Sequence, residues 1–434
     1  MNSMEKIKKY DTIVIGLGAS GLFFCAGSGS APLRGKTLVL EKNNRAGVKL
    51  LMSGGGQCNF THQGSIKEFT CHYGDKGSAI RHCLYKHNNL EMMDFVQALG
   101  ISILKREDGK VFPKSLQSKE LLDALLKKCH ENQVSILYDR SVMNIVPLEK
   151  GFSVTASDSS GDESTFCCDN LVVASGGCSY PTTGSDGRIF NLLSKGLNIP
   201  LVTPRPALTP IYISDYPFSS VSGVSLSGVA MKIIGGNSCD DNSSGQNTDK
   251  SRSKSASRVF TGDLLFTHKN LSGPLILNNS RYVSPQDALE FNYVYPEDYQ
   301  RVVAGLKSAF HGNGKEVIPF ISGKYMLPRS FVQCLLDDDF LHKKMSSLSG
   351  SDINLLALRL TKSRYTVQSL SGFNKAMVTA GGVHLSAVNL KTMESTQYPG
   401  LFFIGEVLDI DGDTGGYNIQ FAYSSAMVVR DRLA

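Results

Sequence analysis

The sequence contains no tryptophan, no CxxC pair of cysteines and few charged residues. Only 19% of its 434 residues are charged, below the usual quarter, and 45 basic against 39 acidic side chains give a net charge of +6. This excess is too small to indicate a nucleic-acid-binding protein by itself. No apolar run approaches the roughly 18 residues that a membrane span requires, so we expect no association with a membrane.

The ten cysteines are scattered, without the spacing of a disulfide framework, which indicates reduced thiols and predicts a cytoplasmic protein. The basic stretch from Met1 to Tyr10 is followed by a β-type sequence rather than by the apolar core of a signal peptide. One segment is rich in cysteine and histidine, but none of its spacings matches a zinc site, and we expect no bound metal. Its members are Cys71, His72, His82, Cys83 and His87.

Glycine is abundant instead: it supplies 42 residues, about a tenth of the chain, against a usual share near 7%. A β-branched run at residues 10–15 leads into Gly16-Leu-Gly-Ala-Ser-Gly21, and a second predicted strand ends at Glu41. This is the dinucleotide-binding fingerprint, whose glycines allow a tight turn, a close approach to a pyrophosphate and helix–strand packing. Glu41 would accept the ribose hydroxyls and repel a 2′-phosphate, which disfavours NADP. The alternative is an ordinary βα turn.

Three consecutive glycines occur in a second loop, Lys49 to Thr61, at Gly54, Gly55 and Gly56. Such a run loses much backbone entropy on ordering, which makes sense where the backbone must lie against a flat ligand. The alternative interpretation is a flexible surface turn.

Further glycines precede the predicted final helix, Asn418 to Leu433, which we expect to be amphipathic. The segment Pro399 to Glu406 resembles a strand that ends in Gly-Glu, and the loop from Asp411 to Asn418 opens the helix. A second helix N-terminus behind a glycine loop would be a second anion site. It would suit a group that becomes negative during a reaction, such as N1 and the C2 carbonyl of a reduced flavin.

The chain is expected to be α/β and to consist of a nucleotide-binding domain that is interrupted and then completed by the C-terminal segment. Three prolines near residue 204 mark the first boundary. The predicted parts are residues 1–203, a β-rich domain at 204–295, a helical domain at 296–358, and the returning segment 359–434. Within the β-rich domain, residues 237–258 are rich in serine and almost free of apolar side chains, which predicts a mobile insertion.

Four stretches resemble, in order, the signatures of the bacterial flavoproteins known as NAD(FAD)-utilising dehydrogenases. They are KLLMSGGGQCNFTH, GGCSYPTTGSDG, TGDLLFTHKNLSGP and MESTQYPGLFFIGEVLDIDGDTGGYNIQFAYSS. The family includes a bile-acid-inducible reductase and an aminoacetone oxidase, and the resemblance runs from Gly16 to near Ser425. It implies a Rossmann-like FAD-binding domain of the glutathione-reductase type, with inserted β-barrel-like and helical domains. Gln57 departs from the family's usual arginine, and His62 from its usual asparagine.

The resemblance implies FAD as the cofactor and a set of residues that contact it. The pyrophosphate residues would be Gly16, Gly18, Ala19, Ser20 and Gly21. The adenosine end would meet Glu41, Lys42, the backbone of Val142, Gly176 and Gly177. The flavin and ribityl region would meet Lys49, Gly54, Gly55, Gly56 and Asn59. The ribityl chain and pyrimidine edge would meet Gly405, Glu406, Asn418 and Ile419.

We therefore expect an enzyme, an FAD-dependent oxidoreductase that transfers a hydride between flavin N5 and a small organic substrate, NAD(P)H or both. Only one nucleotide fingerprint is present, so NAD(P)H would bind transiently in the substrate cleft, or oxygen would be the acceptor. No catalytic acid or base stands out. Three alternatives remain: an amine oxidase that uses oxygen, an RNA-acting flavoprotein, and a flavin-binding protein without catalysis.

The RNA alternative rests on a basic patch and on the basic side chains of the Ser-rich insertion. The patch consists of Lys105, Arg106, Lys110 and Lys114. No aromatic residues are interleaved with it, so we interpret it as a solvated surface and expect no nucleic-acid partner.

Overall fold

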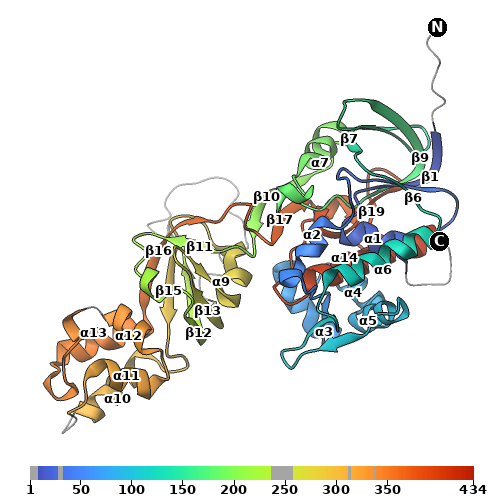
Figure 1. Cartoon of the computed structure of the whole chain (residues 1–434). Helices are drawn as coiled ribbons and strands as arrows, with labels where there is room; N and C mark the ends of the chain where they lie inside the picture. Colours follow the sequence, from blue (N-terminus) through green and yellow to red (C-terminus); the bar gives the residue numbers. More distant parts are fainter. Residues whose placement is uncertain (1–7, 28–32, 236–257, 311–313, 337) are drawn as a thin grey trace. The chain divides into compact units, whose positions relative to one another are not determined.

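The computed structural model describes residues 8–27, 33–235, 258–310, 314–336 and 338–434 (Figure 1). Of the insertion predicted to be mobile, residues 237–257 lie outside this description. The chain forms two compact units: unit 1 consists of residues 1–207 and 376–434, and unit 2 of residues 208–375. Unit 1 therefore contains both the first and the last segments of the chain.

A nine-stranded mixed sheet forms the centre of unit 1. Five neighbouring strands run parallel, in the order β20 (Leu401–Phe403), β9 (Glu163–Val173), β1 (Lys8–Ile15), β2 (Thr37–Leu40) and β6 (Ser135–Leu137). The remaining strands are antiparallel: β7 (Ser141–Pro147), β8 (Phe152–Ser157), β18 (Val388–Asn389) and β19 (Glu394–Ser395). All four residues of β2 are buried, as expected for a parallel strand covered on both faces.

Helices and short strands surround this sheet. The helices of unit 1 are α1 (Ala19–Ala26), α2 (Val48–Met52), α3 (Ile66–Phe69), α4 (Arg81–Lys86), α5 (Asn89–Ala98), α6 (Ser118–Glu131), α7 (Arg188–Asn191) and α14 (Tyr417–Leu433). A small sheet contains β3 (Thr61–His62), β4 (Ile103–Lys105) and β5 (Lys110–Pro113), and a ribbon pairs β10 (Leu201–Ala207) with β17 (Val378–Val383).

The final helix α14 differs from the amphipathic helix that the sequence predicts. Nearly all of its residues from Tyr417 to Arg430 are buried, because α14 packs against α1, α4 and α5 on different sides. The buried guanidinium of Arg430 donates a hydrogen bond of 2.7 Å from Nη1 to the carbonyl of Phe24, close to the C-terminus of α1. The predicted helix is present, but the prediction that it is amphipathic was wrong, and α14 is a central element of unit 1.

Unit 2 contains a closed six-stranded barrel. Together with the helix-covered parallel strands of unit 1, this barrel confirms the predicted fold class of a Rossmann-type α/β protein with a barrel-like insertion. The barrel order is β11 (Ile211–Ile213), β14 (Leu271–Ser272), β13 (Val259–Phe266), β12 (Ser225–Ile234), β15 (Ala288–Asn292) and β16 (Ser363–Leu370). Its helices are α9 (Pro274–Asn279), α10 (Tyr299–Phe310), α11 (Val317–Tyr325), α12 (Arg329–Leu336) and α13 (Gly350–Thr361).

The barrel and the helices of unit 2 share one hydrophobic core. Phe266 of β13 stacks on Phe331 of α12 with the ring centroids 5.3 Å apart, and Phe218 packs against both rings. Helix and barrel therefore bury their apolar faces against each other. Within the described ranges, no helix is long and apolar enough to cross a membrane.

Candidate cofactor site

Gly16 and Gly18 lie in the turn between β1 and α1, Gly21 lies within α1, and each has a different environment. Gly16 has φ +95°, and a Cβ there would lie 2.9 Å from the carbonyl oxygen of Ala174. A Cβ on Gly21 would lie 2.2 Å from the oxygen of Gly16, so the helix packs on the strand only with glycine at this position. A Cβ on Gly18, by contrast, would meet nothing within 4 Å. Gly16 and Gly21 therefore serve packing within the protein, whereas Gly18 borders open space.

The open space at Gly18 lies at the N-terminus of α1. Gly18 is the N-cap residue of this helix, and no side chain caps its first N–H groups. Ala19 and Ser20 form the first turn, as the fingerprint predicts. Backbone N–H groups and the positive end of the helix dipole suit a phosphate, so the residues present fit the pyrophosphate of FAD.

Glu41 is buried directly after β2, beside the fingerprint turn. Its Oε2 accepts a hydrogen bond of 2.6 Å from the N–H of Leu17, and its Oε1 accepts one of 2.8 Å from the N–H of Asn43. Burial raises the pKa of this carboxyl, and the two N–H donors oppose the shift. A carboxylate has about four lone-pair positions, so Glu41 keeps acceptor capacity for ribose hydroxyls while it holds the turn.

The other residues predicted for the adenosine end lie in or directly after strands of the same sheet. Lys42 forms an ion pair with Asp186, so its ammonium points toward this carboxylate. Val142 lies at the start of β7, shortly after Arg140, whose N–H donates to the carbonyl of Glu41 at 2.9 Å. Gly176, with φ +73°, and Gly177 follow β9.

The triple glycine adopts a left-handed backbone, with φ of +56°, +65° and +86° at Gly54, Gly55 and Gly56. A Cβ on Gly55 would meet nothing within 4 Å. Next to this run, Asn59 is 9% exposed, and its buried Oδ1 has no hydrogen-bond partner among the described residues. This unpartnered hydrogen-bond acceptor lies beside the backbone of Gly55, which no other described residue covers. Such an arrangement fits a ligand that supplies a hydrogen-bond donor, as the polar edge of a flavin or its ribityl hydroxyls would.

An ion pair joins the two halves of unit 1 at this site. Lys49 Nζ lies 2.7 Å from Glu406 Oε2, and the two side chains are 25% and 20% exposed. Glu406 Oε1 also accepts a hydrogen bond of 2.8 Å from the N–H of Thr379. The predicted residues Lys49 and Glu406 are thus brought together although 357 residues separate them.

Thr379 was not among the predicted cofactor residues, yet it connects two glycine segments. Its fully buried Oγ1 accepts hydrogen bonds from the N–H groups of Cys178, at 2.7 Å, and Ser179, at 3.1 Å. A Cβ on Gly177 would lie 2.4 Å from the same oxygen. The available signal was a polar residue directly before the Ala-Gly-Gly sequence of β17.

Thr379→Val is expected to destabilise the protein by about 3 kcal/mol, because the buried N–H of Ser179 and the partly buried N–H of Cys178 lose their acceptor at about 1–3 kcal/mol each. Urea unfolding followed by circular dichroism would measure the change. The matched control is Thr396→Val, at an exposed position, which should cost no more than about 0.5 kcal/mol. Equal stability of the two variants would contradict the connecting role of Thr379.

The loop before α14 is held by two side chains, Asn418 in the first turn of α14 and Lys76 from a distant segment of the chain. Asn418 Oδ1 accepts from the N–H of Gly412 at 2.7 Å, and Asn418 Nδ2 donates to the carbonyl of Gly412 at 2.9 Å. Lys76 pairs with Asp409 and, at 3.5 Å, with Asp411. Asn418 thus shapes the loop, and any contact it makes to a flavin comes in addition to these bonds.

Two further side chains fix the start of α14. The ring of His72 stacks on Tyr417 with the centroids 4.0 Å apart, and His72 Nδ1 lies 3.1 Å from Asp413 Oδ2. Burial, together with the charge of Asp413, raises the pKa of Tyr417 far above its usual range, so the phenol stays protonated. Ile419 is half-buried in the first turn, and the N–H of Gly405 donates to Ser425 Oγ at 3.0 Å. These contacts hold the helix N-terminus in place for an anionic group.

Arg106 of the basic patch contacts the triple-glycine loop. Its Nη2 donates to Gln57 Oε1 at 2.8 Å, and its guanidinium lies 4.1 Å from the ring centroid of Phe112. The loop therefore has an arginine beside it, although position 57 itself carries glutamine. Lys110 pairs with Asp108 at 2.6 Å on the exposed surface. Among the hydrogen bonds and ion pairs of the described residues, Arg106 is the member of the patch whose side chain reaches the loop.

The thiols near the site are not activated. Burial raises the pKa of Cys58 to about 11, and the pKa of Cys178 also to about 11. Both thiols remain protonated at neutral pH, and a thiolate nucleophile is absent at these two positions. Over the described ranges, no cluster of three or more histidine, cysteine, aspartate or glutamate side chains could hold a metal ion.

Comparisons with known proteins identify relatives along almost the whole chain. A family model described as the HI0933-like protein Rossmann domain matches residues 10–431. The chain is 29% identical to a ribosomal RNA dihydrouridine synthase from Haemophilus influenzae, over 96% of each chain. It is 29% identical to the protein of the same name from Escherichia coli, over 97% of each chain. It is 24% identical to a 3-dehydro-bile acid delta(4,6)-reductase from Clostridium scindens, over 95% of this chain and 96% of that one.

Proposed function

Because the chain belongs to the HI0933-like family of FAD-binding Rossmann proteins and is an FAD-dependent oxidoreductase, we propose that it reduces a carbon–carbon double bond conjugated to a carbonyl group. The proposed substrate is a uracil base of RNA. The buried, unpartnered Oδ1 of Asn59 beside the triple glycine is the observation that carries the flavin chemistry. The sequence favoured a small organic molecule as the substrate. The proposed substrate is instead that of the alternative, an RNA-acting flavoprotein.

The names of the relatives share one kind of chemistry. A dihydrouridine synthase saturates the C5–C6 bond of uracil, which is conjugated to the C4 carbonyl. The name of the bile-acid enzyme describes reduction of a steroid with double bonds at positions 4 and 6. In both cases a hydride is added to an electron-poor carbon and a proton to another carbon of the conjugated system. The two RNA-modifying relatives have the higher identity, 29% against 24%, which favours uracil.

The residues of unit 1 have distinct tasks in this reaction. When bound, FAD would carry the hydride from a reduced pyridine nucleotide to the substrate. Glu406, held by the N–H of Thr379, fixes the ammonium of Lys49 at the site. The triple glycine offers a flat backbone surface, and the N-terminus of α14 adds positive potential where negative charge develops.

The test is an anaerobic experiment with purified holoprotein. The flavin is reduced with NADH or NADPH, and its reoxidation is followed after addition of ribosomal RNA transcribed in vitro, which carries no modifications. We expect reoxidation and new dihydrouridine in equal amounts, detected by nucleoside mass spectrometry. A 4,6-dien-3-one steroid is offered to the reduced flavin in the same anaerobic assay, and a panel of primary amines is offered separately to the oxidised enzyme in the presence of oxygen. Rapid turnover of either one, without dihydrouridine formation, would refute the RNA substrate.

A further inference from the structure

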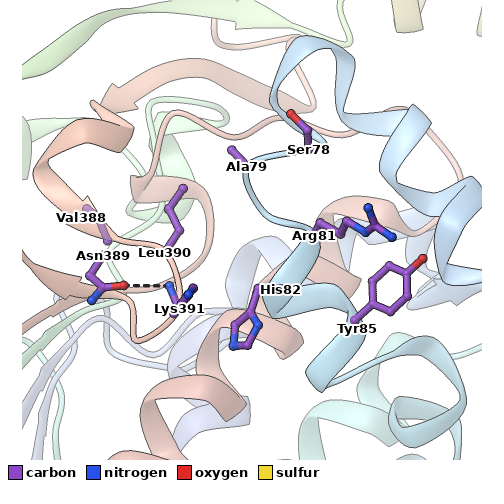
Figure 2. A pocket seen from close by; sticks show the side chains of 9 residues that line it. All are labelled: Ser78, Ala79, Arg81, His82, Tyr85, Val388, Asn389, Leu390 and Lys391. Atoms are coloured by element: carbon purple, nitrogen blue, oxygen red, sulfur yellow. Dashed lines mark hydrogen bonds between the residues drawn. The ribbon is translucent and has the colours of Figure 1, made fainter.

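Unit 1 contains a hollow that shares no lining residue with the glycine loops. Its volume is about 790 Å³. Figure 2 shows two segments that face each other across it: residues 78–85, which include the start of α4, and residues 388–391, which include β18 and the turn after it. The polar and aromatic side chains that line it include Arg81, His82, Tyr85, Asn389 and Lys391.

The charge of this hollow is of one sign. Arg81 and Lys391 are exposed, His82 lies between them in Figure 2, and no carboxylate is among the lining residues. Within the described residues, neither Arg81 nor Lys391 forms an ion pair. The neighbouring Lys86, by contrast, pairs with Asp431 at 2.6 Å. Two cations without counter-ions at one hollow favour an anionic ligand.

An exposed aromatic ring accompanies the cations. Tyr85 is 43% exposed, and the guanidinium of Arg81 lies 5.0 Å from the centroid of its ring. Proteins bind single-stranded nucleic acids by combining basic side chains for the phosphates with aromatic rings on which bases stack. An acidic peptide would use the cations but would have no need of a ring face beside them.

The segment that carries Arg81 and Tyr85 is firmly anchored. His87, which caps α4 and is buried, lies 2.9 Å from Glu91 through Nδ1 and 3.1 Å from Asp431 through Nε2. Its carbonyl accepts hydrogen bonds from Gln420 and Ser424 of α14. The wall of the hollow that α4 forms is thus attached to α14, the helix whose N-terminus belongs to the cofactor site.

We propose that this hollow binds a single-stranded stretch of RNA, with one phosphate at Arg81, a second at Lys391 and a base stacked on Tyr85. This inference rests on the proposed function, because it assigns the hollow to nucleotides that flank the reduced uracil. His82 and Asn389 would contact the sugar–phosphate backbone between the two phosphates.

The test measures binding of a fluorescein-labelled, single-stranded 12-nucleotide RNA to the holoprotein by anisotropy at several salt concentrations. The variant Arg81→Gln/Lys391→Gln should bind about ten-fold more weakly at 0.1 M salt. The slope of log K against log salt should fall by about 1.4, since each phosphate contact to a single strand contributes about 0.7. Tyr85→Leu should weaken binding about five-fold without a change of slope.

The matched control is Lys150→Gln/Lys195→Gln, which removes the same charge at two exposed lysines outside the hollow and should bind like the unaltered protein. Equal affinity of this control and of the Arg81/Lys391 variant would overturn the proposal. So would polyglutamate of the same length if it displaced the RNA at equal concentration.

The same variants separate this inference from the proposed function. If the unaltered protein forms no dihydrouridine but its RNA binding depends on Arg81 and Lys391, the proposed function fails and the binding site stands. If dihydrouridine forms equally well with the unaltered protein and the Arg81/Lys391 variant at limiting RNA, the proposed function stands and the binding site fails.

Discussion

Gly18→Val is expected to give a folded protein that is colourless. A Cβ at position 18 meets no protein atom within 4 Å, and φ of −78° with ψ of −164° is an extended conformation that valine adopts readily. The larger side chain would instead fill the space in front of the uncapped α1. Displacement of a pyrophosphate from two charge-assisted hydrogen bonds costs about 4 kcal/mol, or about a thousand-fold in FAD affinity.

The measurement is FAD content per chain together with circular dichroism of the same sample. Gly350→Val is the matched control, because a Cβ at Gly350 in unit 2 also meets nothing within 4 Å. It should retain FAD. Gly21→Val should fail at an earlier stage, since its Cβ would lie 2.2 Å from a backbone oxygen and prevent α1 from packing. A yellow Gly18→Val protein with full FAD content would contradict the assignment of the pyrophosphate.

Lys49→Met is expected to retain FAD but to lower the rate of substrate-dependent flavin reoxidation by about a hundred-fold. Removal of one preorganised charged group at a reaction site commonly costs this much. The variant also leaves Glu406 with only the N–H of Thr379 as a hydrogen-bond donor among the contacts described above. Anaerobic stopped-flow absorbance at the flavin band would measure the rate.

The matched control for this variant is Lys343→Met in unit 2. Lys343 Nζ lies 2.9 Å from Asp352, and the exposures of 33% and 19% are close to those of the Lys49–Glu406 pair. It should keep the rate of the unaltered protein. If Lys49→Met also kept that rate, the ion pair would be structural, and the chemistry would have to be assigned to other residues.

The elements that follow from local sequence could be predicted well. Residues 10–21 combine a β-branched run with glycines at fixed spacing, and the structure places β1, a left-handed Gly16 and α1 there. The Gly-Glu sequence at Gly405 likewise marked the end of a strand. In each case the information lies within a few neighbouring residues, because backbone conformation is decided locally.

The connections between distant segments could not be predicted. Thr379, Lys76 and Arg106 contact the candidate site only because the fold brings together segments that are far apart along the chain, and no spacing rule describes such a pair. The amphipathic pattern of residues 418–433 misled for a related reason. Polar residues such as Gln420 and Ser424 are buried, because they bond to the carbonyl of His87 rather than to water.

Because unit 1 is built from two separate stretches of the chain, its parts are synthesised at different times. The ribosome makes β9 and α1 early, but their neighbours β20 and α14 emerge only after residues 208–375. At about 5–20 residues per second, that delay is on the order of 10–30 s. Unit 2 has its own core and can fold in this interval, whereas the apolar surface of α1 waits for its partner. Chaperone capture of nascent chains should therefore be concentrated on the first 207 residues and end when α14 leaves the ribosomal tunnel.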